Sequence, residues 1–178
     1  TKKNLDRGQK LIPKITKKPA VFFDRDGVIN YDKGYTYKIE DFKFRANIIN
    51  ILKKIAKKKY YIFIVTNQAG IAHGIFSKEN FIELQKNLKK ILFNKNILIH
   101  DVKFCIFHEN AVIKKYRKKT AYRKPGNLMI ENLKRNWNIN IKRSIMVGDK
   151  FSDEKCAKKS GIKFFYPQNK FIKYIKNL

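Results

Sequence analysis

The sequence predicts an α/β fold of three layers, in which one parallel sheet carries helices on both faces. Short apolar runs alternate along the chain with segments whose apolar residues recur at helical spacing. Polar and charged residues follow directly on several of these runs. Strands that alternate with helices pair in parallel, because each right-handed crossover returns the chain to the same edge. With 178 residues and 43% hydrophobic content, the chain has the length and core of one domain.

The first expected strand, residues 20–23, is an apolar run that ends in charge. Asp24 and Asp26 follow it at a spacing of two, so both carboxylates lie on the same side of an extended chain. Residues 27–44 hold glycines and aromatics without a steady period. They are expected to form a structured loop or small flap beside the tip of the strand.

The remaining elements follow from periodicity, caps and breakers. Residues 60–65 are a continuous apolar run, typical of a strand that is buried on both faces. Ser77 is a helix-starting residue, and Gly161 ends a short helix. We expect further strands at 102–107, 144–147 and 162–166, helices at 46–58, 77–92, 128–137, 153–160 and 169–177, and an irregular basic segment at 108–122.

The domain organisation is predicted to be simple. Residues 1–18 read as a basic N-terminal extension, and residues 19–178 as a single domain. No apolar run approaches the roughly 20 residues of a membrane span, and no signal-peptide core is present. The two cysteines, Cys105 and Cys156, fit a reducing compartment without disulfides. A cytoplasmic monomer without a membrane partner is therefore expected.

The charge of the chain is extreme, with 42 Lys and Arg against 14 Asp and Glu, a net of +28. Such a field attracts phosphorylated metabolites, nucleic acids or acidic membrane surfaces. The lysines occur singly or in short groups on every segment, whereas a dedicated nucleic-acid surface concentrates them on one face. Compositional drift explains this pattern better, with only non-specific binding of nucleic acid at low salt.

Parallel topology gathers the chemically active residues at one sheet edge. Asp24 and Asp26, Thr66, and Asp149 each follow an expected strand, and Lys124 precedes a helix at the same edge. A carboxylate can attack phosphorus while a second acid moves protons. A hydroxyl and a lysine stabilise a transferring phosphoryl group, and clustered carboxylates suit Mg²⁺. This set of residues is complete for phosphoryl transfer.

The same residues resemble the motifs of the haloacid dehalogenase superfamily of aspartyl phosphatases. In order these are Asp24-Arg25-Asp26-Gly27-Val28, Thr66, Lys124, and Gly148-Asp149. The resemblance implies a Rossmann-like fold of the haloacid dehalogenase type. It also implies Asp24 as nucleophile, Asp26 as general acid and base, and Thr66 and Lys124 as phosphoryl-binding residues. Mg²⁺ would be held by Asp24, Asp149 and the backbone carbonyl of Asp26. Asp153 either supports this site or is an ordinary acid in the first turn of a helix.

Finer motifs across residues 20–166 look like those of the D-glycero-D-manno-heptose 1,7-bisphosphate 7-phosphatases. They are Asp24–Asn30, Gly34-Tyr35, Phe42–Phe44, Val65–Ala72, Arg123–Pro125 and Met146–Lys150. The resemblance implies Mg²⁺-dependent removal of the 7-phosphate, in heptose supply for lipopolysaccharide. The implied contacts to the phosphorylated sugar are Asp32, Lys33, Gly34, Tyr35, Asn67, Gln68, Ala69, Arg123 and Lys150.

Two other activities stay open at this stage. Histidinol-phosphate phosphatases share the Asp-Arg-Asp-Gly and Arg-Lys-Pro motifs, although Gly34-Tyr35 favours the heptose branch. A nucleic-acid 3′-phosphatase would share the superfamily chemistry and would explain the charge, but no base-stacking module is visible in the sequence.

Three departures or omissions shape the expected site. Many relatives carry a zinc loop, but the matching positions here are Cys105, Phe107, Thr120 and Tyr122, one thiol where zinc needs about four ligands. No zinc is expected, and the segment 108–122 is either ordered in another way or mobile. His73 stands where relatives often have arginine. The chain has no room for a large cap domain, so loops at 30–37, 67–73 and 108–123 would set specificity.

Overall fold

A computed structural model describes residues 17–177 of the chain. The predicted extension, residues 1–18, therefore lies outside the described residues apart from its last two. Lys18 forms an isolated parallel bridge with Ile139. Its backbone is bonded on both sides, to Asn138 O at 3.1 Å and from Asn140 N at 2.8 Å. Lys18 is thus already joined to the folded domain.

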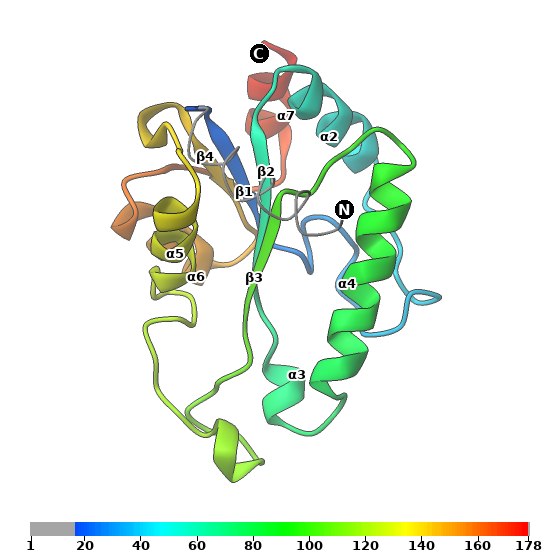
Figure 1. Ribbon diagram of the computed structural model, residues 1–178, viewed down its shortest axis with the longest axis vertical. Helices are drawn as coiled ribbons and strands as arrows, with labels where there is room; N and C mark the ends of the chain where they lie inside the picture. The colour runs from blue at the N-terminus through cyan, green and yellow to red at the C-terminus, as the bar shows by residue number, and fades with distance from the viewer. Residues whose placement is uncertain (1–16, 178) are drawn as a thin grey trace, which may run out of the picture.

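Five parallel strands form the single sheet, in the order β3-β2-β1-β4-β5 (Figure 1). The order reverses at β1, because β2 and β3 lie on one side of it and β4 and β5 on the other. Such a reversal opens a crevice beyond the carboxyl ends of the strands. The parallel sheet predicted from the alternating pattern is confirmed. The strands are β1 Ala20–Phe23, β2 Tyr61–Asn67, β3 Asp101–Cys105, β4 Ile145–Val147 and β5 Lys163–Phe165.

Helices cover both faces of the sheet, with α2, α4 and α7 on one side and α5 and α6 on the other (Figure 1). Alternate residues of β1 show the split: Val21 and Phe23 pack in the first layer, and Phe22 packs in the second. The helices are α2 Ile48–Lys57, α3 Ala69–Ala72, α4 Lys78–Phe93, α5 Leu128–Asn136, α6 Phe151–Lys159 and α7 Asn169–Lys176, with 3₁₀ turns at Lys114–Tyr116 and Ile141–Arg143.

Local chemistry explains which predicted helices are confirmed and which features of the helices differ from the prediction. Ser77 caps α4, as predicted, by accepting from the backbone of Asn80 while the Asn80 side chain accepts from Ser77. The short helix α3 was not predicted, because four residues leave no periodic signal. The first residue of α5, Leu128, is 42% exposed, whereas Met129 beside it is buried in the core.

The segment 108–122 is ordered by hydrogen bonds and apolar packing. Ile113 N donates to Ala72 O at 3.0 Å, and Arg117 Nε donates to Ala111 O at 2.8 Å. The ring of Tyr116 packs against the apolar cluster beside α4. These contacts join the segment 108–122 to α3 and to the apolar cluster beside α4.

The four positions that match the zinc ligands of related proteins do not offer a zinc donor set. Cys105 is buried, and its thiol lies 3.7 Å from the carbonyl of Phe107. Thr120 Oγ1 accepts from the backbone of Tyr122 at 3.1 Å. The rings of Phe107 and Tyr122 pack against the core under α5. Aromatic packing thus takes the place of ligands at two of the four positions.

His100 generates a prediction about stability and pH. Its Nδ1 accepts from Ile62 N at 3.0 Å, and its ring lies edge-on to Trp137. Burial, with Lys18 nearby, lowers the pKa of His100 from 6.5 to about 4. Between these values the unfolded chain binds the extra proton, so this contribution to stability is present above pH 6.5 and is lost as the pH falls toward 4.

We expect His100→Asn, whose side-chain oxygen can accept from Ile62 N, to remove this loss. Urea unfolding of both proteins at pH 7.5 and pH 5 measures it. The free energy of unfolding should fall more in the wild type than in the variant. Equal losses in the two proteins would show that His100 does not titrate as described.

Candidate active site

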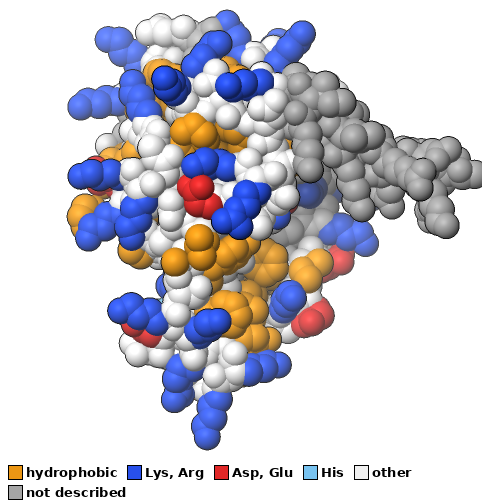
Figure 2. Space-filling view, turned by 60° about the vertical axis from the view of Figure 1, so that its left-hand side comes forward, with side chains coloured by type: hydrophobic (Ala, Val, Ile, Leu, Met, Phe, Trp, Pro, Cys, Tyr) orange, Lys and Arg blue, Asp and Glu red, His pale blue; other side chains and the backbone are white. Residues whose placement is uncertain are grey.

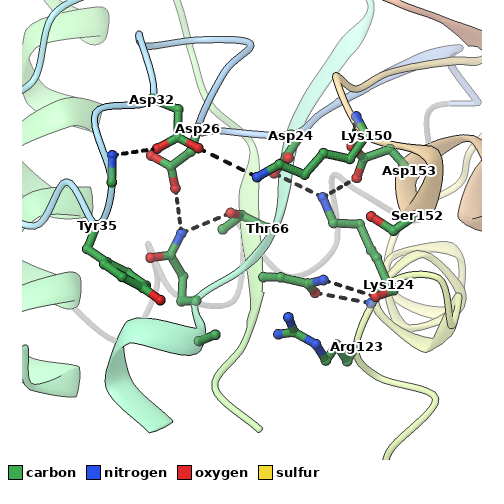
Figure 3. Close-up of a pocket in the computed structure, with 14 residues that line it drawn as sticks. Asp24, Asp26, Asp32, Tyr35, Thr66, Arg123, Lys124, Lys150, Ser152 and Asp153 are labelled. Atoms are coloured by element: carbon green, nitrogen blue, oxygen red, sulfur yellow. Dashed lines mark hydrogen bonds and ion pairs between the residues drawn. The ribbon is translucent and has the colours of Figure 1, made fainter. Parts of the chain in front are cut away.

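The carboxyl ends of the strands bring the predicted catalytic residues into one cavity of about 390 Å³. Asp24 and Asp26 follow β1, Thr66 lies at the end of β2, and Lys124 precedes α5. Figure 3 shows Asp24 and Asp153 pointing toward the end of the Lys124 side chain. The cavity is lined by Asp24, Asp26, Asp32, Gly34, Tyr35, Thr66, Asn67, Gln68, Ala69, Arg123, Lys124, Lys150, Ser152 and Asp153.

The structure gathers nearly all residues that the sequence analysis assigned to the substrate. Lys33 is the exception: it is exposed and faces a neighbouring depression beside Tyr37 and Lys43. His73 also does not line the cavity, and its ring lies 5.1 Å from that of His108. The three expected specificity loops therefore contribute to the cavity at different positions: Asp32, Gly34 and Tyr35 from the first, Asn67, Gln68 and Ala69 from the second, and Arg123 from the third.

Lys124 is the buried centre of the site. Its Nζ lies 2.9 Å from Asp24 Oδ1 and 2.6 Å from Asp153 Oδ1, and all three side chains are at most 8% exposed. Burial alone would lower the pKa of Lys124, but the two carboxylates reverse this and raise it to about 12. Lys124 is thus a permanent cation beside the expected nucleophile.

Asn67 fixes the backbone of Lys124. Its Nδ2 donates to Lys124 O at 3.0 Å, and its Oδ1 accepts from Lys124 N at 3.1 Å (Figure 3). This pair of bonds joins the end of β2 to the loop before α5. Asn67, predicted as a substrate contact, therefore also holds the backbone of Lys124 in place.

Asp24 is placed by the sheet itself. Its backbone N–H donates to Val147 O at 2.9 Å, which extends the pairing of β1 with β4 by one residue. Burial raises the pKa of Asp24 to about 6, an effect that Lys124 opposes and Asp153 increases. The carboxylate is thus poorly hydrated and faces the cavity, as a nucleophile requires.

Asp26 lies at the same cavity, but its environment is different. Its carboxyl accepts hydrogen bonds from Arg25, from Asn30 at 3.0 Å and from Gln68 at 2.9 Å. Its side chain is 17% exposed, so it can reach a bound molecule. The two acids of the motif therefore have separate surroundings, which favours separate roles.

Asp24, Asp149 and Asp153 form a compact carboxylate cluster whose oxygens lie within 4.8 Å of one another. Asp149 Oδ1 is buried without a hydrogen-bond partner, and burial raises the pKa of this acid. Clustered, partly unsatisfied carboxylates fit a hard divalent cation. The predicted side-chain ligands Asp24 and Asp149 are thus together, and the carboxyl of Asp153 lies with them.

Two glycines of the motifs allow this crowding. A Cβ on Gly27, whose φ is +83°, would lie 2.0 Å from Asp149 Oδ2. A Cβ on Gly148 would lie 2.2 Å from the Cβ of Asp153. Both positions therefore need glycine for Asp149 and Asp153 to reach the site.

Residues at the mouth of the cavity form an open polar rim. Lys150 Nζ lies 3.5 Å from Asp32 Oδ2, across the cavity entrance (Figure 3). Tyr35 is 47% exposed, and its ring lies beside that of Phe76. No cap domain interrupts the described chain between β1 and β2, so this rim meets solvent.

Ser152 lines the cavity but was not predicted from the sequence. Asp153 was predicted either to support the site or to be an ordinary acid in the first turn of a helix. Asp153 is fully buried, its Oδ2 accepts from Lys150 N at 3.0 Å, and its other oxygen pairs with Lys124. It therefore supports the site. Its position shortly after Asp149 in the sequence pointed to the site, but this spacing alone does not show that Asp153 pairs with Lys124.

Comparison with known proteins agrees with this geometry. A sequence profile of the family described as Polynucleotide kinase 3 phosphatase matches residues 19–171. The chain is 37% identical over 149 residues to a D-glycero-beta-D-manno-heptose-1,7-bisphosphate 7-phosphatase of Rhodopseudomonas palustris, covering 84% of this chain and 83% of that one. It is 40% identical over 143 residues to a D-glycero-alpha-D-manno-heptose-1,7-bisphosphate 7-phosphatase of Photorhabdus laumondii, with 80% and 78% covered.

Solved structures share the fold. A putative HAD-like phosphatase from Mesorhizobium loti superposes with a TM-score of 0.78 at 28% identity, over 84% of this chain and 71% of that one. A D,D-heptose 1,7-bisphosphate phosphatase from B. bronchiseptica, complexed with magnesium and phosphate, gives 0.73 at 19% identity, over 82% and 78%. These likenesses confirm the α/β fold of the haloacid dehalogenase type. The chain belongs to the D-glycero-D-manno-heptose 1,7-bisphosphate 7-phosphatase family of the haloacid dehalogenase superfamily.

Proposed function

We propose that this phosphatase removes the 7-phosphate of D-glycero-D-manno-heptose 1,7-bisphosphate in a Mg²⁺-dependent reaction, in heptose supply for lipopolysaccharide. The observation that carries the proposal is the convergence of Asp24, Asp26, Thr66 and Lys124 on one open cavity. The names of the sequence relatives support the sugar bisphosphate as substrate. Residence in the cytoplasm and a monomeric state stay predictions. Within residues 17–177, no helix is long and apolar enough to span a bilayer.

The geometry supports a two-step reaction through Asp24. In the first step an Asp24 oxygen bonds to phosphorus, the bond from phosphorus to the sugar oxygen breaks, and Asp26 gives its proton to that oxygen. In the second step water attacks phosphorus, Asp26 takes its proton, and the bond from Asp24 to phosphorus breaks. Thr66 and Lys124 stabilise the phosphoryl oxygens in both steps.

Asp24 and Asp149, with the backbone carbonyl of Asp26, would hold Mg²⁺. The carboxylate cluster and the unpartnered Asp149 Oδ1 fit such a cation. When bound, it supplies positive charge that offsets repulsion between phosphate and carboxylates. The phosphatase from B. bronchiseptica, crystallised with magnesium and phosphate, is consistent with this choice.

The rim of the cavity suits a substrate with a second phosphate. Arg123 and Lys150 both line the cavity, and Lys150 is well exposed. The sequence relatives include enzymes named for each anomer of the heptose, so both anomers are candidates.

A polynucleotide 3′-phosphate is the second candidate, favoured by the matching family profile and the net charge of +28. Figure 2 shows Lys and Arg side chains spread over the whole visible face, not gathered into one stripe. A surface that binds a nucleic-acid backbone would concentrate Lys and Arg side chains on one face. This distribution supports the sugar substrate over the polynucleotide.

A substrate panel tests the choice. Phosphate release with Mg²⁺ is measured for both anomers of the heptose bisphosphate, histidinol phosphate and a 3′-phosphorylated oligonucleotide. We expect the highest kcat/KM for a heptose bisphosphate, with the 7-phosphate removed and the 1-phosphate retained. Preference for histidinol phosphate, or salt-sensitive turnover of the oligonucleotide, would overturn the proposed substrate.

The nucleophile can be tested by Asp24→Asn, which keeps the size of the side chain. Loss of the attacking oxygen should lower kcat by a factor of at least about 10³. The control is Arg135→Gln, which changes an exposed residue in the last turn of α5 and should retain activity. Unchanged phosphate release by Asp24→Asn would contradict the aspartyl-phosphate mechanism.

Metal dependence gives a further prediction. Treatment with EDTA should abolish phosphate release, and added Mg²⁺ should restore it. Mg²⁺ should also raise the thermal unfolding midpoint of the wild type, since a ligand that binds only the folded state stabilises it. Asp149→Asn should reduce this rise and require at least about tenfold more Mg²⁺ for activity. Full activity after EDTA treatment would exclude the proposed cation.

A further inference from the structure

Arg25 lies between the two catalytic acids in sequence, yet its side chain does not line the cavity and is fully buried. Its guanidinium donates hydrogen bonds to both carboxylate oxygens of Asp26. Nη2 lies 2.8 Å from Oδ2 and 2.9 Å from Oδ1, and Nε lies 3.1 Å from Oδ1. The guanidinium also lies over the ring of Phe81, 5.4 Å from its centre. Arg25 is thus fixed in the core while its end holds the carboxyl of Asp26.

Gln68, which lies between β2 and α3, also binds the carboxyl of Asp26. Its Nε2 lies 2.9 Å from Asp26 Oδ2 and 2.9 Å from Thr66 Oγ1, and Figure 3 shows both bonds between the labelled acid and threonine. Its Oε1 lies 3.4 Å from Arg25 Nη2. The proton-transfer acid and the phosphoryl-binding hydroxyl are therefore joined through one amide.

The same guanidinium reaches the loop at the cavity mouth. Arg25 Nη2 donates to the backbone carbonyl of Thr36 at 2.8 Å, and Thr36 is buried. The preceding residues Asp32, Gly34 and Tyr35 line the cavity. One buried cation thus connects Asp26 with the loop that faces the substrate.

A proton-transfer group works only within hydrogen-bond reach of the reacting oxygen. The planar fork of arginine fixes both the position and the plane of a carboxylate, which a lysine cannot do. We propose that Arg25 and Gln68 are positioning residues that hold the Asp26 carboxyl for proton transfer and couple it to the loop at residues 31–37. This inference rests on the proposed function of Asp26 as acid and base.

The test compares two esters that differ in their need for proton transfer. p-Nitrophenyl phosphate releases a stable anion, whereas benzyl phosphate releases an alkoxide unless its oxygen is protonated. First-turnover rates of both are measured with Mg²⁺ for the wild type, Arg25→Lys, Arg25→Gln and Gln68→Met, with Arg135→Gln as the control. Circular dichroism and the unfolding midpoint select the variants that fold.

For Arg25→Gln and Gln68→Met we expect benzyl ester cleavage to slow by about tenfold or more. The first turnover of the nitrophenyl ester by Arg25→Gln should stay within about threefold of the wild type. Gln68→Met also loses the bond to Thr66, so both esters should slow, the benzyl ester by at least about threefold more. Arg25→Lys should fall between wild type and Arg25→Gln on the benzyl ester. Equal losses on both esters, or no loss on either, in a folded variant would overturn the proposal. Gln68→Met decides the outcome if the buried Arg25 variants do not fold.

The esters separate this inference from the proposed substrate. If the wild type cleaves both esters but not the heptose bisphosphate, the sugar assignment fails while the test of Arg25 and Gln68 still decides. If the heptose bisphosphate is turned over but the variants lose both esters equally, the positioning role alone is wrong.

Discussion

Lys124 is a cation enclosed by the protein, and the two carboxylates that flank it make this possible. Its ammonium lies within 3 Å of both Asp24 and Asp153, and none of the three side chains has more than slight contact with water. A buried charge of this kind is tolerated only when it is paired with good geometry. Removing Lys124 would leave two buried carboxylates without their shared cation, so the positions of all three residues depend on one another.

Much of the surrounding structure maintains this arrangement. Asn67 fixes the backbone of Lys124, and the N–H of Lys150 fixes Asp153. Gly148 leaves the space that the side chain of Asp153 occupies. The cluster still carries more carboxylates than cations once Asp149 is included, which explains why it suits a divalent metal. Stability and catalysis therefore draw on the same contacts, and the expected nucleophile is already held beside the cation that would stabilise its phosphorylated form.

The sequence predicted what local patterns and topology control. Apolar runs and helical spacing located the strands, and parallel topology brought Asp24, Thr66 and Asp149 to one edge. Bonds between distant side chains could not be predicted in this way. Asn67 binds the backbone of a residue 57 positions away, and nothing in its own neighbourhood indicates that partner. The role of Arg25 was hidden for a related reason: a charged residue next to an active acid reads as exposed, whereas here it lies in the core.

The proposed mechanism depends on transfer of a phosphoryl group to Asp24 during turnover. Asp26→Asn lacks the base that activates water, and it is mixed with Mg²⁺ and p-nitrophenyl phosphate, whose leaving group needs no proton from Asp26. The reaction is quenched in acid when about one equivalent of nitrophenol has been released. Mass spectrometry of the digested protein then locates the phosphoryl group. We expect it on the peptide that contains Asp24. Its absence after one equivalent of nitrophenol has been released would contradict the aspartyl-phosphate mechanism.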